Sequence, residues 1–410
     1  MATRVETPPA VRPTSLGRLG RGFLVAVGLL VLWGLSAWIY QLTQGLIATG
    51  MRDVVSWGVY IFTFAFLVGL SAGGLIMASA AEVFGVTSLK PLARLGVLTA
   101  AVCVLVAAMT IIPDLGKAKR IWELFRYPNW TSPLIWDIII ILVYFAFAVV
   151  DLTVMSRRSM APSKRAKTLR VLAYVGLPTA VLLHSITAWI FGLQISRPWW
   201  NTALLAPLFV TSAILSGTAL VALAALAVRR FDGIEFSERT WTALAALMAT
   251  TIAVDLFLVA SDYITILWGN VPRERAALDT VLPGGSWQWV FWLEWVVGGI
   301  VPFVLLVVPR LRRNPAVLAL ASFLVLVGVY AFRIELVVGG LITPLLHLPP
   351  GIALGSYTPG QSSFQYFAVY HPTWVEYAIL IGLLSFLTLL ITLGYRWLHP
   401  VERSQPETVS

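Results

Sequence analysis

Long apolar runs separated by short polar segments recur along almost the whole chain of 410 residues. Ten runs reach 20 residues or more, the length that an α-helix needs to cross the hydrocarbon layer of a bilayer. They lack the two-residue alternation of transmembrane β-strands. The pattern predicts an all-α polytopic membrane protein with ten transmembrane helices. The predicted spans are residues 23–42, 56–84, 93–113, 133–155, 170–195, 202–228, 240–268, 287–308, 315–338 and 374–397.

A weak internal repeat organises the middle of the chain. The second span contains LSAGGLIMASAAEV at residues 70–83, and the sixth contains LSGTALVALAALAV at residues 215–228. Each run places a small-residue cluster before an Ala-rich half, a composition that lets helices approach closely in lipid. We interpret spans 2–5 and 6–9 as two parallel four-helix bundles, flanked by spans 1 and 10.

This interpretation divides the chain into six segments. The predicted segments are a cytoplasmic disordered tail (1–22), the first helix with its outer loop (23–55), a first four-helix unit (56–200), a second four-helix unit (201–338), an outer cap (339–373) and the last helix with a cytoplasmic tail (374–410). The opening residues are polar and basic, and no small-residue cleavage site follows the first apolar run, so we predict that this helix is retained.

Lys and Arg residues predict the orientation. With the N-terminus in the cytoplasm, twenty of the 29 Lys and Arg residues fall in inner segments and eight in outer segments. The remaining one, Arg333, falls within a span. This asymmetry follows the positive-inside rule and predicts that both termini are cytoplasmic. The net charge of +10 therefore reports mainly on topology, and no nucleic-acid motif accompanies it.

Ionisable residues inside the spans are the candidates for chemistry, because such groups are costly in lipid and usually face a bundle interior. His184 lies about 21 Å from the inner boundary at a rise of about 1.5 Å per residue. The same arithmetic places Asp137, Asp255 and Glu294 at about this level. Each four-helix unit thus holds two titratable groups in its outer half.

Each of these groups also has a purely structural alternative. His184 can serve as a hydrogen-bonding residue between helices, Asp137 can be solvated near the interface, and Glu294 lies in a tryptophan-rich run that resembles an aromatic belt. Further candidates, Asp262, Arg333 and Glu335, are predicted near the outer surface, where Arg333 can simply pair with one of the two acids.

The few cysteines and histidines limit the possible cofactors. Cys103 is the only cysteine, so this chain is expected to hold no iron–sulfur cluster. Bis-histidine haem requires paired helix histidines, but apart from His184 the chain has only His347, His371 and His399, near the outer cap and the C-terminus. We therefore expect no haem and no metal site, and electrons would have to come from another chain or a diffusible carrier.

Four segments carry a resemblance that covers nearly the whole chain beyond its tail. They are SWGVYIFTFAFLVGLSAGG (56–74), NWTSPLIWD (129–137), HSITAWIFGLQISRPWWNTALLAPLFVTSAILSG (184–217) and YHPTWVEYAILIG (370–382). Together they resemble the NrfD family, the quinone-reactive membrane subunits of polysulfide-reductase-type molybdoenzymes and of alternative complex III. The ten spans are similar to the longer branch of that family.

The resemblance implies a quinone site in the first four-helix unit. Menaquinone or ubiquinone would be the bound substrate, with His184, Asp137, Tyr60 and Trp189 as candidate binding residues. An unperturbed histidine titrates near neutral pH, so the residue type of His184 suits proton exchange. The shorter family members place a histidine and an asparagine on their first bundle helix, whereas the corresponding stretch here, VYIFTFAF, has neither.

The resemblance also implies partners. A ferredoxin-like iron–sulfur subunit would dock on the outer, periplasmic face, with a molybdopterin-type or other catalytic subunit beyond it. The basic outer loop 114–132 is the candidate docking site, or else a surface amphipathic helix. The candidate docking residues are Lys117, Lys119, Arg120, Arg126 and Arg197.

Two functions remain open from the sequence. The favoured one is a quinone-reactive anchor subunit of a respiratory oxidoreductase in the bacterial cytoplasmic membrane, with no catalysis by this chain alone. Its second unit would supply a proton path. The path candidates are Asp255, Glu294, Asp262, Arg333 and Glu335. The alternative is a proton-coupled secondary transporter, although transporter sites usually lie at interrupted helices near the midplane.

Overall fold

The computed structural model describes residues 18–52, 55–157, 159–342 and 370–402. Within these ranges the chain is helical, with ten helices long and apolar enough to cross a membrane. They are α1 (Arg18–Gln44), α2 (Val59–Val83), α3 (Ala93–Asp114), α5 (Pro133–Ser156), α6 (Pro162–Gly192), α7 (Leu205–Asp232), α8 (Glu238–Gly269), the composite helix of α10 (Gln288–Phe291), η4 (Trp292–Ile300) and α11 (Val301–Val307), α13 (Pro315–Ile342) and α14 (Trp374–Glu402). The prediction of an all-α protein with ten spans is confirmed.

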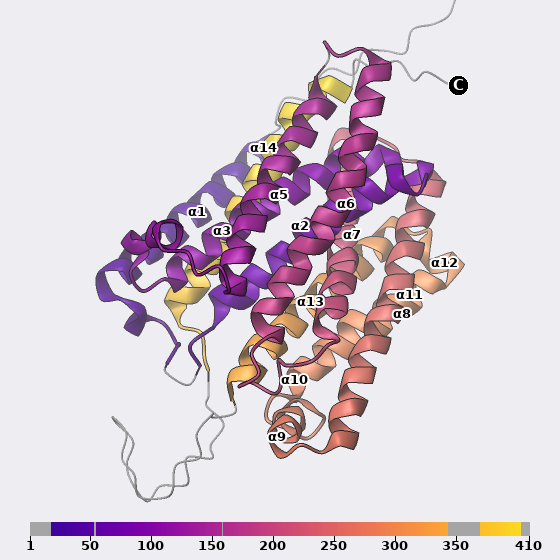
Figure 1. Ribbon diagram of the computed structural model, residues 1–410. Coiled ribbons are helices and arrows are strands. Elements are labelled where there is room, and N and C mark those ends of the chain that lie inside the picture. The colour runs from indigo at the N-terminus through magenta and orange to yellow at the C-terminus, as the bar shows by residue number, and fades with distance from the viewer. Residues whose placement is uncertain (1–17, 53–54, 158, 343–369, 403–410) are drawn as a thin grey trace, which may run out of the picture.

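Short helices occupy the connections between the spans. They are η1 (Leu46–Ala48), η2 (Thr87–Leu92), η3 (Ala118–Arg120), α4 (Glu123–Arg126), α9 (Pro272–Val281) and α12 (Pro309–Arg312). Figure 1 shows α9 at one end of the elongated bundle and the end of α14 at the other. We call the end that carries α9, where α5 and α7 begin, the outer end, following the orientation predicted from Lys and Arg.

Some helices extend beyond the ends of the predicted spans, because the chain stays helical after its apolar run has ended. α6 begins at Pro162, eight residues before the predicted start, because its first turns carry Lys and Arg residues that favour helix but not lipid. α13 continues to Ile342, four residues past the predicted end. The rest of the predicted outer cap, up to residue 369, and most of the predicted N-terminal tail lie outside the described residues.

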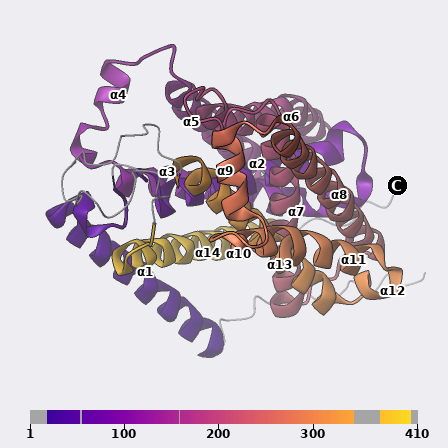
Figure 2. The same cartoon turned by 90° about the horizontal axis from the view of Figure 1, so that it is seen from below.

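Helices α2 and α7 hold the centre of the bundle. α2 contacts α3, α6, α7 and α13, and α7 contacts α6, α8 and α13. α5 packs against α3 and α6 on one side of the central pair, while α11 and η4 pack against α13 and α8 on the other. α1 and α14 pack against each other at one edge, and Figure 2 shows this pair beside the rest of the bundle.

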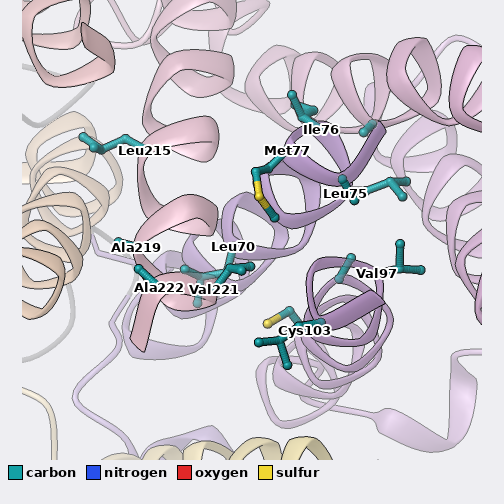
Figure 3. Close-up of a cluster of buried hydrophobic side chains, with 14 of the residues drawn as sticks. Leu70, Leu75, Ile76, Met77, Val97, Cys103, Leu215, Ala219, Val221 and Ala222 are labelled. Carbon is teal, nitrogen blue, oxygen red and sulfur yellow. The ribbon is translucent and has the colours of Figure 1, made fainter. Parts of the chain in front are cut away.

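The two small-residue clusters of the repeat face each other between α2 and α7. A Cβ atom added to Gly217 would lie 2.5 Å from the backbone carbon of Gly73, so only glycine permits this approach. Apolar side chains of α2, α3 and α7 gather in one buried cluster, which includes Leu70, Cys103 and Leu215 (Figure 3). The close contact between these glycines fixes the separation of the two central helices. In lipid, helices gain little free energy from burying apolar side chains, so small residues that allow close backbone packing stabilise their association.

Candidate functional site

His184 on α6 and Arg333 on α13 are in direct contact at the centre of the bundle. Arg333 Nη2 lies 3.1 Å from His184 Nε2, and both residues have no solvent-exposed surface. A guanidinium group has only donors, so His184 Nε2 accepts the hydrogen bond and the ring proton is on Nδ1. The same Nη2 atom donates to Ser212 Oγ on α7 at 2.7 Å. The contact thus joins three helices.

Aromatic rings and a glycine enclose the pair. The guanidinium carbon of Arg333 lies 3.8 Å from the ring centroid of Phe209 and 4.9 Å from that of Phe332, distances typical of cation–π contacts. On α2, a Cβ atom added to Gly69 would come within 3.3 Å of the His184 ring. Gly69 therefore provides space for the imidazole between α2 and α6.

Several donors of this pair lack acceptors. Among the described residues, His184 Nδ1 and the Nε and Nη1 atoms of Arg333 have no hydrogen-bond partner, although all three are buried. Buried donors without acceptors are costly, and in native proteins they usually meet a ligand, an ion or an ordered water molecule. The arrangement thus offers N–H groups to an acceptor that the described part of the chain does not supply.

Asp137 reaches the same region from α5. Its Oδ1 atom accepts a hydrogen bond from Thr187 Oγ1 at 2.7 Å, and Thr187 lies one helical turn beyond His184 on α6. Asp137 is buried, with an exposed fraction of 2%. The structure therefore brings Asp137 and His184 to neighbouring levels of one bundle, as the depth arithmetic predicted.

The other two candidates for the quinone site lie elsewhere. The Tyr60 hydroxyl donates to Gln41 Oε1 on α1, and Gln41 Nε2 donates to the Pro113 carbonyl on α3. Tyr60 precedes Gly69 by nine residues on α2, which is about 13 Å along the helix. Trp189 faces outward, with 37% of its surface exposed. Neither residue lies beside His184.

Two of the acids proposed for the second unit bind hydroxyl groups of neighbouring helices. Asp255 on α8 accepts from Thr211 on α7 at 3.0 Å, and Asp262 accepts from Thr202 at 2.7 Å. Asp255 lies within electrostatic range of Arg333.

The two remaining acids lie together. Glu335 on α13 accepts a hydrogen bond from the Tyr263 hydroxyl at 2.5 Å, and Glu294 interacts with Glu335. One carboxyl oxygen of each glutamate is buried and has no hydrogen-bond partner within the described part of the chain. Glu294 belongs to the π-helical segment Trp292–Ile300, a local widening that is common at functional sites.

The position of Arg333 corrects one expectation. The sequence placed it near the outer surface, paired with Glu335 or Asp262, but α13 extends nine residues beyond Arg333 and leaves it deep in the bundle. Its contact is with His184, a residue assigned from the sequence to the other four-helix unit. Neighbouring positions on a helix face different directions, so Arg333 and Glu335 meet different partners.

The basic residues of the outer end fall into two kinds. Lys117, Lys119, Arg120 and Arg126 are exposed, and Arg120 forms an ion pair with Glu123 at 2.7 Å. Figure 2 shows α4, which ends at Arg126, at the periphery of the bundle. Arg197 is half-buried, and this burial lowers its pKa from the usual value. It donates to the Gly340 carbonyl at 3.3 Å and lies over the Trp200 ring.

A column of aromatic rings, which we did not identify from the sequence, leads from the outer end to His184. Trp57 stacks on Trp200 with ring centroids 5.6 Å apart, and Phe191 packs edge-on against both. Phe191 then contacts Phe209, whose ring centroid lies 4.9 Å from that of His184. Its members come from the segment before α2, from α6, from the α6–α7 connection and from α7, so no single helix signals the column.

Within the described ranges, no group of three or more His, Cys, Asp or Glu side chains is arranged to hold a metal ion. The fold and the site define a multi-pass membrane protein with a buried layer of histidine, arginine and carboxyl groups. The sequence pattern described as "Polysulphide reductase, NrfD" matches residues 48–345. The chain therefore belongs to the NrfD family.

Similar proteins with a described function support this assignment. The chain is 37% identical to a putative membrane subunit of dimethyl sulfoxide reductase from Halobacterium salinarum, over 96% of this chain and 94% of the relative. It is 27% identical to an Hdr-like menaquinol oxidoreductase integral membrane subunit of Archaeoglobus fulgidus, over 94% and 96%. It is 23% identical to a selenate reductase subunit from Mesobacillus selenatarsenatis, over 94% of each chain. These relatives are subunits of oxidoreductases.

Proposed function

We propose that this chain is the membrane subunit that exchanges electrons between a membrane quinone and an iron–sulfur subunit docked at the outer end. The family and its relatives support a place in a respiratory oxidoreductase complex, and one relative is named for menaquinol. The chain would lie in the bacterial cytoplasmic membrane with both termini inside. Catalysis on the terminal substrate would belong to a partner, such as a molybdopterin-type subunit.

One observation carries this proposal: the three buried N–H groups of His184 and Arg333 that have no acceptor among the described residues. A quinone presents two carbonyl oxygens, which are hydrogen-bond acceptors, and it takes up two electrons and two protons on reduction. Donors held in place before the substrate arrives stabilise charge that develops on those oxygens. The layer around His184 therefore has the chemistry that a quinone headgroup requires.

His184 is suited to deliver protons to this substrate. Its Nδ1–H group is a donor, and Arg333 holds its other nitrogen as an acceptor. Asp137, one helical turn away through Thr187, can return a proton to the imidazole after each transfer. Arg333 provides a positive charge that favours the reduced, more negative oxygen. The aromatic column from Trp57 to Phe209 offers flat apolar surfaces along which a quinone ring can pack.

The outer end supplies the partner surface in this proposal. Lys117, Lys119 and Arg126 project from a loop at the periphery, where they can attract an acidic partner. Arg197 contributes differently, because it secures the end of α13 through the Gly340 carbonyl. Electrons would enter or leave close to this end, which is also where the aromatic column begins.

The acids around α8, η4 and α13 form the second half of the proposal, a proton path. Asp255 and Glu294 lie within electrostatic range of Arg333, and Glu294 interacts with Glu335. Each of the two glutamates keeps one carboxyl oxygen without a hydrogen-bond partner among the described residues. Asp262 and Thr202 continue the polar series toward the outer end. Because Arg333 contacts His184 and lies within electrostatic range of Asp255 and Glu294, a change of charge at the quinone site would change the electrostatic potential at these acids.

The deciding experiment is purification of the chain from its own membranes with its partners. We expect an iron–sulfur subunit and bound menaquinone or ubiquinone to copurify, and the complex to reduce or oxidise a water-soluble quinone analogue. A matched preparation carrying His184→Ala should keep the partners and lose the quinone activity. Isolation of a lone chain that carries substrate-dependent proton flux without quinone would instead identify a transporter.

A further inference from the structure

The connection from α5 to α6 and the first turns of α6 are strongly basic. Residues 157–170 contain six Lys and Arg residues and no acidic one, and the next acidic residue after Asp151 in the chain is Asp232. Four of these basic side chains are exposed, and we call them the basic rim: Arg157, Lys164, Lys167 and Arg170. The basic rim concentrates positive charge at the inner ends of two spanning helices.

The charges of the basic rim are not paired within the described part of the chain. At two other inner connections, Lys90 pairs with Glu82 at 3.1 Å and Arg229 pairs with Glu235 at 2.9 Å. Among the described residues, no ion pair involves a member of the basic rim. Orientation in a membrane depends on Lys and Arg and hardly on acidic residues, so topology alone does not require that acids be absent here.

The position of these charges on α6 is electrostatically unfavourable. The helix begins at Pro162, and its first turn contains no acidic residue. The N-terminal end of a helix dipole carries partial positive charge, which favours anions and disfavours cations. Lys164 and Lys167 therefore add like charge to this end of the helix. An anion bound from outside the chain would relieve the repulsion.

An apolar, exposed side of α6 continues directly from the basic rim. Lys164, Val171 and Val175 are spaced by seven and four residues, which places them in one row along the helix. Lys167 and Tyr174, seven residues apart, form a second row beside it. Val171, Val175 and Tyr174 are 56%, 50% and 57% exposed. Each row thus joins an ammonium group at the inner end to an apolar surface at membrane depth.

Helix α5 repeats this arrangement beside α6. The two helices pack against each other and run in opposite directions, so the end of α5 lies at the same end of the bundle as the start of α6 (Figure 1). Arg157 caps the end of α5, and Val149 and Val150, two turns before it, are 42% and 50% exposed. Both helices therefore present aliphatic side chains next to positive charge. They are also the helices that carry Asp137 and His184.

We propose that the basic rim binds an anionic phospholipid of the inner leaflet, whose acyl chains lie along the exposed faces of α5 and α6. The phosphodiester group would accept hydrogen bonds from Lys and Arg, whose long side chains reach the headgroup level from helix ends. A soluble anion would balance the charge but gain nothing from Val171 and Val175. A zwitterionic lipid brings its own cation to the rim. This site is separate from the layer around His184, and it does not depend on quinone as the substrate.

The test uses the purified complex in mild detergent and phosphatidylglycerol with a photoreactive acyl chain. After irradiation, we expect label on the α6 peptide that contains Val171 and Val175, and much less label from phosphatidylcholine with the same chain. The Lys164→Gln, Lys167→Gln double variant should lower the affinity of this labelling about tenfold or more, because each basic residue near an anionic surface contributes about fivefold. Lys164→Arg, Lys167→Arg keeps both charges and should label like the unmodified complex.

A matched control removes two exposed charges from another inner connection. Arg310→Gln, Arg313→Gln should leave the labelling of α6 unchanged, and an equal loss there would reduce the effect to general charge attraction and overturn the site. Equal labelling by the two lipids, or unchanged affinity in Lys164→Gln, Lys167→Gln, also overturns it.

Two further measurements complete the test. Displacement of the lipid by inorganic phosphate at millimolar concentration would identify a site for a soluble anion instead and overturn the lipid. If the glutamine variant fails to assemble, a salt series on the unmodified complex decides. Labelling by phosphatidylglycerol should then decrease as salt rises, because ions screen exposed charges, and salt-independent labelling contradicts the proposal.

Discussion

Arg333 Nη2 lies 3.1 Å from His184 Nε2, although the two residues are separated by 149 positions in the chain. The contact links α6 with α13 and places the only Lys or Arg that is more than one residue from the end of a predicted span against the only histidine far from the end of a span. Charged groups are rare at membrane depth and are usually paired and functional. The pair is therefore the natural place to begin mutational tests.

Replacement of His184 should abolish quinone turnover. In the His184→Ala variant the proton donor is lost, and we expect a decrease of about 100-fold or more, in line with the loss of a general acid–base group. Quinone-dependent activity of the purified complex is the measurement. Ser185→Ala is the matched control, because among the described residues that hydroxyl donates only to the Val181 carbonyl of its own helix. Retained turnover in His184→Ala would show that the site lies elsewhere.

Arg333→Met should weaken turnover through the same contact. The variant keeps a long side chain but loses the charge and the hydrogen bonds to His184 and Ser212, each worth about 1.5–3 kcal/mol when one partner is charged. Arg333→Lys should recover part of the activity. Combined with His184→Ala, the Arg333→Met change should cost much less than it does alone, because the two residues act together. Fully additive effects would contradict a shared role.

Glu294→Gln tests the proton path without removing the quinone site. Glutamine can keep a hydrogen bond to Glu335, but it cannot carry a proton. We expect quinone turnover to continue in detergent, while the number of protons moved per quinone decreases in liposomes. Asp279→Asn is the control, because Asp279 is exposed and pairs with Arg275 on α9. An unchanged ratio of protons to quinone would exclude Glu294 from the path.

Gly217→Ala should destabilise the bundle. The added methyl group would lie 2.5 Å from backbone atoms of Gly73 and Gly74 and would force α2 and α7 apart. Overpacking of this kind costs about 1–3 kcal/mol, and a lower thermal melting temperature of the purified complex would report it. Gly28→Ala on α1 is the matched control, because no atom lies within 4 Å of its added Cβ. Equal melting temperatures for the two variants would refute this packing argument.

Neutralisation of the outer loop should weaken partner binding. We expect the Lys117→Gln, Lys119→Gln double variant to lose the iron–sulfur subunit at lower salt concentrations than the unmodified complex, because exposed charge pairs are screened by ions. Copurification across a salt series measures this effect. Arg120→Gln should matter less, since Arg120 is already paired with Glu123. If the iron–sulfur partner stays bound equally in all three, the loop is not the docking site.

The helices could be predicted from the sequence because hydropathy acts locally. Each span is recognised by its own apolar length, and all ten fall on helices of the structure. Errors arose only at ends such as those of α6 and α13, where helix continues into polar or glycine-rich sequence. The similar depth of His184 and Asp137 in the bundle could also be predicted, since depth along a helix follows from residue count and rise.

The partners of those residues could not be predicted in the same way. Tyr60 faces Gln41 instead of His184, and Trp189 faces outward, because the rotation of a helix about its axis depends on its neighbours. Glu294 lies on a π-helical segment, which no composition signal marked. The aromatic column required Trp57, Phe191 and Phe209 to be brought together from separate segments.

By itself, the sequence determined the ten spans, their predicted orientation and the level at which the titratable groups lie. These properties depend on the free energy of transferring each residue from water to lipid, which is largely independent of the rest of the chain. Only the tertiary structure decided that Arg333 meets His184 and that Tyr144 meets Ser71. Such contacts depend on how apolar helices rotate and pack, and in lipid that choice is set by small residues and polar pairs far apart in the chain.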